Sequence, residues 1–594
     1  MTARLGGSAR AAADGSNFGL KRIGRVGTFL VLGLLAAGII CLRLLPGGSL
    51  SEIFFREQDV LVLPLAYLAL DFLPLLGLSG GGWRAVTGWL GRRPAAFAAI
   101  AAALTVLIAF AGVFLILHDY PLSADEYMAS FDAKIFRHGV VLAKVAPEWR
   151  PYGQALLPIF SLNVADHSVW SSSYYPMNAA FQALFDVIGL RRAAGAFWAG
   201  LSVLLTFGLA RRLWPDRPAA AIVAAVLLAT SSQLLITAMT PYAMSAHLAL
   251  NLLWLTLFLR KGWLSQVGAL AVAFAACGLH QLIFHPLFAA PFILQLWLDR
   301  RWRPAAVYTL GYAVIALFWA SYWGLVLSTA HLPPTASTER GPHYLVDTLL
   351  ALVGALDLHA IQLTVENLVR LAAWQNPMAI VLALLGAPAA WRAKGVLRSL
   401  LIGVVLSFCV VGALQPYQGH GWGYRYLHGL LGSLCLIGAL GWIQLWGGEA
   451  ADTRQAGFAA VLASGLFALL ILFPIHAWQA NRFTAPYARA EALIRRQNAD
   501  VVLINGAGLA FPYDLARNDP WLSNRPKVMA VPGLEEDTLA KVCASYKVAV
   551  FDYSTGRAMG IRPINEGEGW TINGVLAKLV KAGKCGTPIA LAKP

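Results

Sequence analysis

The sequence predicts an all-α polytopic membrane protein with about thirteen transmembrane helices, followed by a small α/β domain at its C-terminal end. Of the 594 residues, 58% are apolar and only 13% are charged, whereas soluble domains carry roughly a quarter charged residues. Apolar runs long enough to cross a bilayer recur through residues 26–474, and residues 475–594 change to alternating helix-like and strand-like segments. This composition excludes a disordered chain and an ordinary soluble enzyme.

The transmembrane domain is predicted from the apolar runs and from the charges between them. The basic segment 1–25 precedes the first run without an evident cleavage site, so we expect a signal anchor with a cytosolic N-terminus. The runs lie at about 26–46, 58–79, 96–117, 193–210, 219–238, 243–259, 264–282, 286–298, 305–328, 376–391, 397–414, 427–446 and 456–474.

The orientation follows from the basic residues between these runs. Five of the gaps that become cytosolic carry clusters of them: Arg84, Arg92 and Arg93; Arg211, Arg212 and Arg217; Arg260 and Lys261; Arg300, Arg301 and Arg303; and Arg392, Lys394 and Arg398. This is the positive-inside pattern. The net charge of +16 therefore indicates topology, and no nucleic-acid partner is expected.

This topology places three loops outside the cytoplasm, 118–192, 329–375 and 415–426, together with the C-terminal domain 475–594. We expect the protein in the bacterial inner (plasma) membrane. Within 329–375, which carries a polar stretch at 338–344, helices are predicted at 345–356 and 363–373, and these are expected to cover an active cavity.

The C-terminal domain is predicted from two short strand-like runs, 499–504 and 548–551, and from helix-like stretches at 487–497 and 535–545. Cys543 and Cys585 lie in this polar part and would pair in an oxidising compartment; the alternative is two partly buried, unpaired residues. The Gly506-Ala507-Gly508 sequence imitates a dinucleotide-binding turn but has Phe511 in place of the third glycine. No cofactor is therefore expected.

The external loop 118–192 begins with an acidic pair, Asp125 and Glu126, a few residues beyond the end of a predicted membrane helix. A carboxylate at the lipid–water boundary is partly desolvated, which raises its pKa and makes it a better general base. The alternative is that both acids are solvated and simply begin an amphipathic helix, 125–138, capped by Ser123 and ended by Gly139. The Tyr127, Phe131 and Ile135 face of that helix is then expected on the membrane surface.

Aromatic residues later in the same loop include Trp170, Tyr174 and Tyr175. Aromatic rings at this depth are typical of the headgroup zone of a membrane. They also suit sugar rings, whose C–H faces stack on aromatic side chains. The two interpretations remain open for each single residue.

Three motifs on the external side together resemble the GT-C glycosyltransferases. They are Asp125-Glu126, Tyr175-Pro176 and the Gly421 to Leu427 segment with its Arg-Tyr-Leu. Over roughly 96–446 the chain is most similar to the branch of protein O-mannosyltransferases and the aminoarabinose transferase of lipid A. It departs from that branch in three ways: the acidic pair follows the third helix instead of the first, Tyr175-Pro176-Met177 replaces a Pro-Pro, and His280 with His285-Pro286 replaces an Arg-Pro.

The resemblance implies a donor sugar carried on a polyprenyl phosphate, with Asp125 as the general base that takes the proton of an acceptor hydroxyl and Glu126 beside it. The lipid phosphate leaves with negative charge, which needs donors at the interface. Arg425 is the first candidate for binding this phosphate, ahead of Lys134, His280, His285 and His420. Alternatively, Arg425 only marks a helix end and extends its charge to the membrane surface. The residues expected to bind the substrates are Tyr127, Trp170, Tyr175 and Tyr424. No metal is expected, since two carboxylates are too few for a tight site.

Two other functions remain open from the sequence. A transporter or flippase would place ionisable residues inside its spans, and Asp71 is the residue that stands out there. A polymerase or ligase of lipid-linked glycans shares the topology and the substrates. The donor sugar and the acceptor, whether lipid A, a cell-wall glycan or a protein hydroxyl, are not specified by the sequence.

Overall fold

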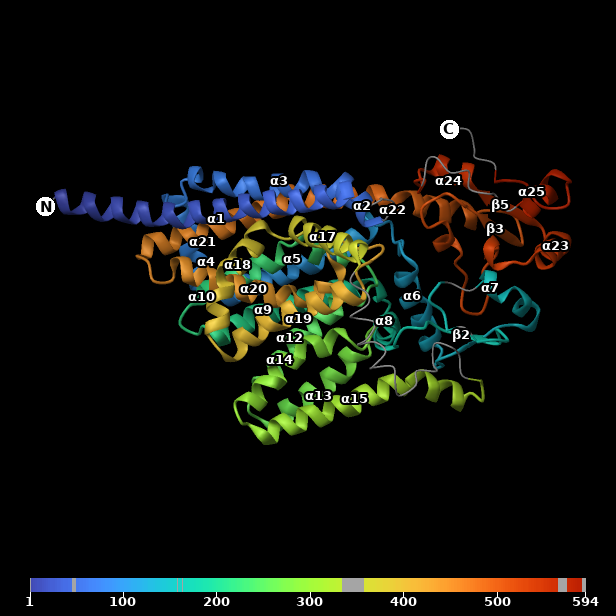
Figure 1. The fold of residues 1–594 in the computed structure, drawn as a ribbon, viewed down its shortest axis with the longest axis horizontal. Helices are drawn as coiled ribbons and strands as arrows, with labels where there is room; N and C mark the ends of the chain where they lie inside the picture. Colours follow the sequence, from blue (N-terminus) through green and yellow to red (C-terminus); the bar gives the residue numbers. More distant parts are fainter. Residues whose placement is uncertain are drawn as a thin grey trace.

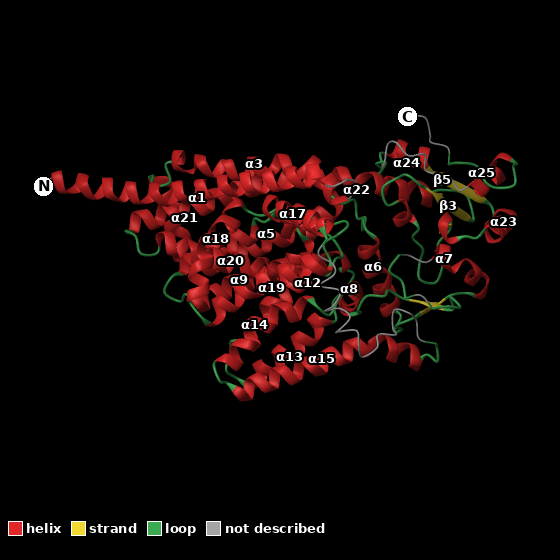
Figure 2. Cartoon of the chain, in the orientation of Figure 1, coloured by secondary structure: helices red, strands yellow, loops and turns green. Residues whose placement is uncertain are grey.

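The computed structural model describes residues 2–44, 50–156, 159–162, 164–333, 357–564 and 574–589, with side chains from Phe18 onward. Most of the chain forms one elongated bundle of helices, and a small α/β region caps one end of it (Figure 1). Strands are confined to that end, as the colouring by secondary structure makes plain (Figure 2). The predicted fold class is confirmed.

The bundle is built from long helices, short helices and several helices with an irregular turn. Its elements are α1 (Thr2–Leu44), α2 (Leu50–Phe54), η1 (Phe55–Asp59), α3 (Val60–Leu68), η2 (Ala69–Leu76), α4 (Gly81–Arg92), α5 (Pro94–Leu115), α9 (Ala194–Leu213), α10 (Pro218–Ala229), α11 (Ser232–Thr237), α12 (Met244–Phe258), α13 (Trp263–Cys277), α14 (Phe284–Leu298), α15 (Trp302–Thr329), α17 (Leu358–Ala373), α18 (Pro377–Arg392), α19 (Gly395–Leu414), η5 (Arg425–Leu430), α20 (Leu431–Trp446), α21 (Ala451–Phe467), η6 (Ala468–Leu472) and α22 (Phe473–Arg495).

The protein is a multi-pass membrane protein. Within the described ranges, eight helical segments are long and apolar enough to cross a membrane, or nine if the bent pair α17 and α18 forms one span. Four shorter apolar helices, α10, α12, α13 and α14, account for the remaining predicted runs. Each of the predicted runs is thus helical, while a count of thirteen complete crossings stays a prediction.

Breaks between helices in the bundle are stabilised by buried polar side chains. The pair α17 and α18 bends by 111°, and Asn376 caps α18 with Pro377 at its first turn. Ser231 caps α11 in the same way and donates to Gln375 at 2.8 Å, which in turn donates to Gln233 at 2.7 Å. This network satisfies polar groups that lipid could not, and it fixes the chain around α11 that leads to the site.

The loop 118–192 and the C-terminal domain lie at the same end of the bundle. Figure 1 places α6 (Ala124–Arg137) and α8 (Met177–Val187) there, beside the C-terminal domain, and α4 with the N-terminus at the other end. The loop also contains β1 (Ala143–Lys144), paired antiparallel with β2 (Val169–Trp170), and α7 (Gly153–Leu156). The predicted topology requires these two regions to lie on the same side of the membrane, and their placement at one end of the bundle agrees with this. Which end faces the cytosol stays a prediction.

The expectation that the Tyr127, Phe131 and Ile135 face of α6 lies on the membrane surface is wrong. Phe131 and Ile135 are buried in a second hydrophobic cluster, which also contains Leu503 and Met529 of the C-terminal sheet. The face is apolar because the C-terminal domain covers it, and a helical periodicity cannot distinguish a protein partner from lipid.

The C-terminal domain is a three-stranded parallel sheet in the order β4–β3–β5 with helices around it. Strands β3 (Val501–Asn505) and β5 (Val548–Asp552) confirm the two predicted strands, and α23 (Glu536–Ser545) confirms a predicted helix; β4 (Lys527–Ala530), α24 (Tyr553–Met559) and α25 (Gly574–Lys581) were not predicted. The predicted helix 487–497 is the end of α22, which continues from α21 and η6. The membrane helix thus continues directly into the C-terminal domain, and the predicted domain boundary at residue 475 lies within helix α22.

Cys543 and Cys585 form a disulfide that ties α23 to the segment after α25. Breaking it with Cys543→Ser should lower the stability of the C-terminal domain by about 2–4 kcal/mol, since the cross-link restricts the unfolded chain. Hydrogen exchange of β5 in the full-length protein measures this, with Cys41→Ser in α1 as the control. Unchanged protection in Cys543→Ser would contradict the expected contribution.

Part of the predicted loop 329–375 can be compared with the structure. The predicted helix 363–373 is the second part of α17. The polar stretch 338–344 and the predicted helix 345–356 lie outside the described residues.

Candidate active site

The acidic pair begins α6, and the first of its two carboxylates meets the late Arg-Tyr-Leu segment. Asp125 Oδ2 lies 2.6 Å from Arg425 Nη1, and the Tyr174 hydroxyl donates to Asp125 Oδ1. Asp125 and Arg425 are both buried. The ion pair joins residues that are 300 positions apart in the chain.

Burial and the partners of Asp125 act on its pKa in opposite directions. Loss of solvent raises the pKa, while the Arg425 guanidinium and the hydrogen bond from Tyr174 lower it. The balance keeps the pKa of Asp125 below its ordinary value, so the side chain is an ionised carboxylate at neutral pH. The expected rise in pKa is therefore wrong for Asp125, because Arg425 and Tyr174 outweigh the loss of solvent. The ionised carboxylate can still accept a proton in a water-poor setting.

The chain before Arg425 is shaped to hold its guanidinium in place. A Cβ at Gly421 would lie 2.9 Å from Arg425 Cδ, and Gly423 has a φ of +69°, which favours glycine. The backbone N–H of Arg425 donates to Gln418 Oε1 at 2.9 Å, and its Nη2 donates to the Tyr426 hydroxyl at 3.2 Å. Arg425 Nε is buried without a hydrogen-bond partner among the described residues, so one donor remains unused.

A small pocket adjoins this ion pair on the side of the helical bundle. Arg425 and Tyr426 line it together with His247, His280 and Ser407. Within the part of the chain that the structure describes, neither ring nitrogen of His247 or His280 has a hydrogen-bond partner. Burial lowers the pKa of His280 to about 4, so this imidazole is neutral at pH 7 and offers a hydrogen bond without charge. Buried, unsatisfied donors of this kind call for a ligand or water.

Glu126 points back to the start of its own helix and away from Arg425. Its Oε2 accepts the Leu122 N–H at 3.0 Å, and its own N–H donates to Ser123 Oγ at 3.2 Å, which is a capping box. Burial raises the pKa of Glu126 to about 8, so it is mostly protonated at pH 7. The two adjacent acids therefore have different environments and different charges.

Glu126→Gln should keep transfer within about threefold of the wild type at pH 7, because glutamine resembles the neutral acid and still accepts the Leu122 N–H. Glu126→Ala, which leaves that buried N–H unpaired, should cost about 1–3 kcal/mol of stability. The folded protein holds the Glu126 proton more tightly than the unfolded chain does, which stabilises the fold at low pH. This stabilisation is lost as the pH rises through about 8. Glu126→Gln cannot titrate and should not show that loss. Thermal unfolding and transfer assays across pH measure both effects; loss of transfer in Glu126→Gln at full stability would assign Glu126 a chemical role.

The remaining predicted phosphate contacts lie in different places. His280 lies with its ring 4.0 Å from that of Tyr174, next to the ion pair. His285 is enclosed in the bundle, its Nδ1 2.7 Å from Asn251 Oδ1 and its Nε2 2.8 Å from the Tyr312 hydroxyl, so it does not line the pocket. Lys134 Nζ lies 3.6 Å from Asp519 Oδ2, on another side of α6.

His420 lies close to the site, but as a neutral group. Its Nε2 is 3.7 Å from Asp514 Oδ2. Burial lowers the pKa of His420 to about 3 and raises that of Asp514 to about 7. The carbonyl of His420 accepts the Tyr242 hydroxyl at 3.2 Å, and this positions Tyr242 under the Arg425 guanidinium at 5.3 Å.

The four aromatic residues predicted to bind substrates are mostly occupied by protein contacts. Trp170 Nε1 donates to the Pro520 carbonyl at 2.6 Å, and the Tyr127 hydroxyl donates to the Asn518 carbonyl. Tyr424 is fully buried. Tyr175 lies beside the site, since its N–H reaches the His280 carbonyl at 3.4 Å. The Tyr175 ring packs against Trp319 at 5.3 Å.

Sequence reasoning missed Tyr174 and His247 at this site. Tyr174 is adjacent to the predicted Tyr175. In an irregular loop, the sequence does not show which of two neighbouring side chains points toward Asp125. His247 had a usable signal, because an ionisable residue inside an apolar run indicates a functional position. In the described parts of the chain, no three His, Cys, Asp or Glu side chains come together as a metal site.

Comparisons with known proteins give a distant structural similarity. No described protein family and no curated protein matches the chain. Among solved structures, the chain is similar to ArnT from Cupriavidus metallidurans in the apo state, with 13% identity and a TM-score of 0.46 over 78% of this chain and 92% of that one. For ArnT from the same organism bound to undecaprenyl phosphate, the values are 13%, 0.43, 75% and 91%. Functional conclusions rest on this chain's own residues.

Proposed function

We propose that the protein is a membrane glycosyltransferase that moves a sugar from a polyprenyl-phosphate donor to an acceptor hydroxyl at the extracytoplasmic membrane face. One observation carries the proposal: a buried, ionised Asp125 held by Arg425, beside a pocket with a mixed apolar and polar lining that includes unused hydrogen-bond groups. A base and a cation at one point are what displacement of a phosphate leaving group needs.

In the proposed reaction, the acceptor oxygen forms a bond to the anomeric carbon as the bond from that carbon to the phosphate oxygen breaks. Asp125 takes the proton of the acceptor hydroxyl, and the lipid phosphate leaves with the electron pair. Arg425 binds Asp125 through Nη1 and keeps Nε free for a phosphate oxygen. Neutral His247 and His280 donate further hydrogen bonds to the same phosphate.

The membrane side of the site suits a lipid donor. The pocket lies against α12, α14 and η5, elements of the apolar bundle, and is lined by Met244, Phe284 and Leu430 as well as by the polar groups. The acceptor reaches Asp125 from the loop 118–192, which lies on the side that the positive-inside pattern makes extracytoplasmic. The resemblance to the GT-C motifs supports the same assignment of donor and base.

A transporter has less support from the charged groups inside the bundle. Asp71 accepts a hydrogen bond from Thr28 at 3.0 Å. Asp59 and Arg370 form a buried pair at 3.1 Å, and Arg370 also donates to the Gly421 carbonyl at 2.8 Å. Arg370, held by Asp59, thus braces the segment that carries Arg425, which is a structural role.

The test is the fate of the donor in proteoliposomes. Purified protein should consume radiolabelled polyprenyl-phosphate sugars, extracted from native membranes, and release polyprenyl phosphate together with a new glycosylated product when cell-envelope acceptors are added. Movement of intact donor between leaflets without product would instead identify a flippase and overturn the proposal.

A further inference from the structure

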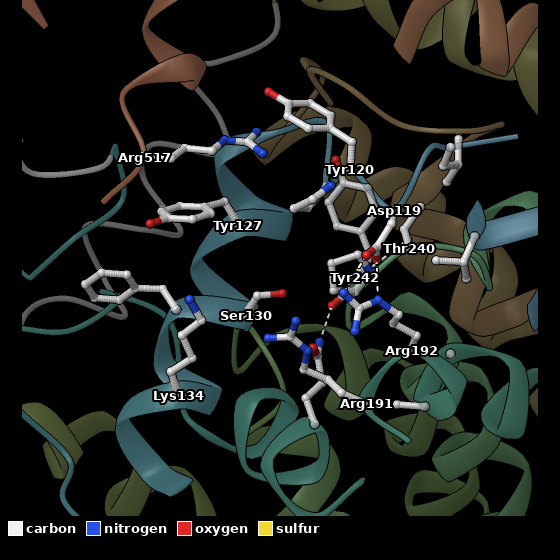
Figure 3. A pocket seen from close by; sticks show the side chains of 18 of the residues that line it. Asp119, Tyr120, Tyr127, Ser130, Lys134, Arg191, Arg192, Thr240, Tyr242 and Arg517 are labelled. Carbon is white, nitrogen blue, oxygen red and sulfur yellow. Dashed lines mark hydrogen bonds and ion pairs between the residues drawn. The ribbon is translucent and has the colours of Figure 1, made fainter. Parts of the chain in front are cut away.

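A larger pocket of about 390 Å³ lies on the other side of α6 and shares Tyr242 with the surroundings of Arg425. Tyr127, Ser130 and Lys134 line it at the spacing of one helix face, whereas Asp125 meets Arg425 and Tyr174 elsewhere on the helix. Its opposite wall is the start of α9 with the preceding η4 (Arg191–Ala193), and its roof is the C-terminal segment 517–524 (Figure 3).

Positive charge exceeds negative charge in the lining of this pocket. Three acids there are each paired with a cation: Asp119 with Arg192, Glu491 with Arg495, and Asp519 with Lys134. Arg517 shares Glu491 with Arg495, and Arg191 is the lining cation without an acidic partner among the described residues. The pocket lies at the ends of α5 and α9, and Arg191 is half-buried there, so an anion in water could reach it.

Arg517 is fixed in the roof with an unused donor. Its side chain is 2% exposed, and its Nε and Nη2 donate to the carbonyls of Asp514 and Leu122 at 2.6 and 3.0 Å. Nη1 has no hydrogen-bond partner among the described residues, and Glu491 Oε2 is 4.0 Å from it. Nη1 is itself enclosed beside Glu491, so Arg517 contributes positive charge behind the pocket wall.

Arg191 lies across the pocket from α6 and reaches toward it near Ser130 (Figure 3). Its guanidinium has no hydrogen bond or ion pair to any part of the chain that the structure describes. Neighbouring Arg192, by contrast, is bound by Asp119. A free guanidinium facing a cavity presents the planar fork that binds phosphate or carboxylate.

We propose that this pocket is a second binding site, for a saccharide that carries a phosphate or a carboxylate. Arg191 binds the anionic group, and the enclosed Arg517 adds positive charge behind it. The rings of Tyr120, Tyr127 and Tyr242, each with an arginine guanidinium over one face, offer their remaining surface to the sugar. The volume lies within the range of ordinary small-ligand sites. Neither Asp125 nor Arg425 lines this pocket, although Tyr242 adjoins both sites. Its occupation does not depend on the proposed transfer reaction.

The test measures binding to the full-length protein in phosphatidylcholine nanodiscs by isothermal titration and saturation-transfer NMR. Glucuronate and glucose 6-phosphate should bind, and glucose at the same concentration should bind at least about tenfold more weakly. Arg191→Gln should weaken the anionic probes about tenfold or more, because it removes a charge-assisted hydrogen bond. Arg557→Gln, an exposed arginine of α24, is the matched control and should bind as the wild type does.

Two further measurements distinguish a lipid headgroup from a water-soluble glycan, and the second binding site from the proposed transfer reaction. Competition by phosphatidylglycerol in the nanodisc would identify a lipid headgroup as the natural anion, and its absence would identify a water-soluble glycan. Asp125→Asn should leave binding unchanged, so loss of transfer with retained binding separates this site from the reaction. Equal binding of glucose and glucuronate, no binding of either anionic probe, or wild-type affinity in Arg191→Gln would overturn the second site.

Discussion

Asp125→Asn should reduce sugar transfer by about 10²–10⁴-fold, the usual contribution of a general base. The substitution keeps the size of the side chain and an oxygen that accepts from Arg425 or Tyr174, but removes the carboxylate that takes the proton. Binding of polyprenyl phosphate should be unchanged or tighter, because Arg425 no longer shares its guanidinium with an anion. The expected pattern is a loss in kcat without a rise in KM for the donor.

The matched control for this variant is Asp166→Asn, an exposed acid in the same loop that accepts from Ser168. It should transfer sugar at the wild-type rate. Undiminished transfer by Asp125→Asn would remove Asp125 as the base, and a loss of donor binding with unchanged kcat would reassign it to the phosphate site.

The pH profile gives a second readout for the same residue. Because Arg425 and Tyr174 hold the pKa of Asp125 below its ordinary value, the wild-type protein keeps this base ionised through the neutral range. Transfer should therefore show no acidic limb from Asp125 between pH 8 and pH 5, and should fall only when the pH approaches the lowered pKa. A limb near neutral pH would assign the base to another group.

Arg425→Gln should reduce transfer by about 10²–10³-fold and weaken donor binding, because it removes the charge that stabilises the leaving phosphate. It also leaves Asp125 buried without its counter-ion, which costs about 3–5 kcal/mol of stability. Arg425→Lys keeps the charge but not the planar fork, so it should recover part of the donor binding and little of the rate.

The double variant Asp125→Asn with Arg425→Gln separates stability from chemistry. Removing both charges should return much of the lost stability, since no unpaired ion stays buried, while transfer should remain absent. Thermal unfolding and donor consumption are measured together for the four proteins of the cycle. Wild-type transfer by Arg425→Lys would instead support the snorkelling alternative, in which this arginine only marks a helix end.

Local patterns predicted several parts of the site well. Ser123 caps α6, and the helix ends at Arg137 before Gly139, as the cap and glycine signals indicated. The disulfide between Cys543 and Cys585 is likewise formed where the sequence left pairing and separation open. The cap and the helix end depend on residues close in sequence, so a pattern suffices to predict them, whereas the structure decided that the two cysteines pair.

Other parts could not be predicted because they depend on packing between distant segments. Strand β4 is four residues long and carries no pattern of its own; it forms because β3 offers it a neighbour. His285 and His280 are similar in sequence context, yet the first bonds to Asn251 and Tyr312 inside the bundle and the second lies beside Tyr174.

The sequence by itself determined the membrane class, the helices and the position of the acidic pair, because a bilayer requires every spanning segment to be apolar and to satisfy its own backbone hydrogen bonds. Only the tertiary structure decided that Asp125 meets Arg425 while Glu126 turns into its helix cap. Asp125 and Glu126 carry the same functional group and are neighbours in the sequence. The protonation state and the contacts of each carboxylate depend on its burial and on partners that lie far away in the sequence. Only the folded chain specifies that burial and those partners.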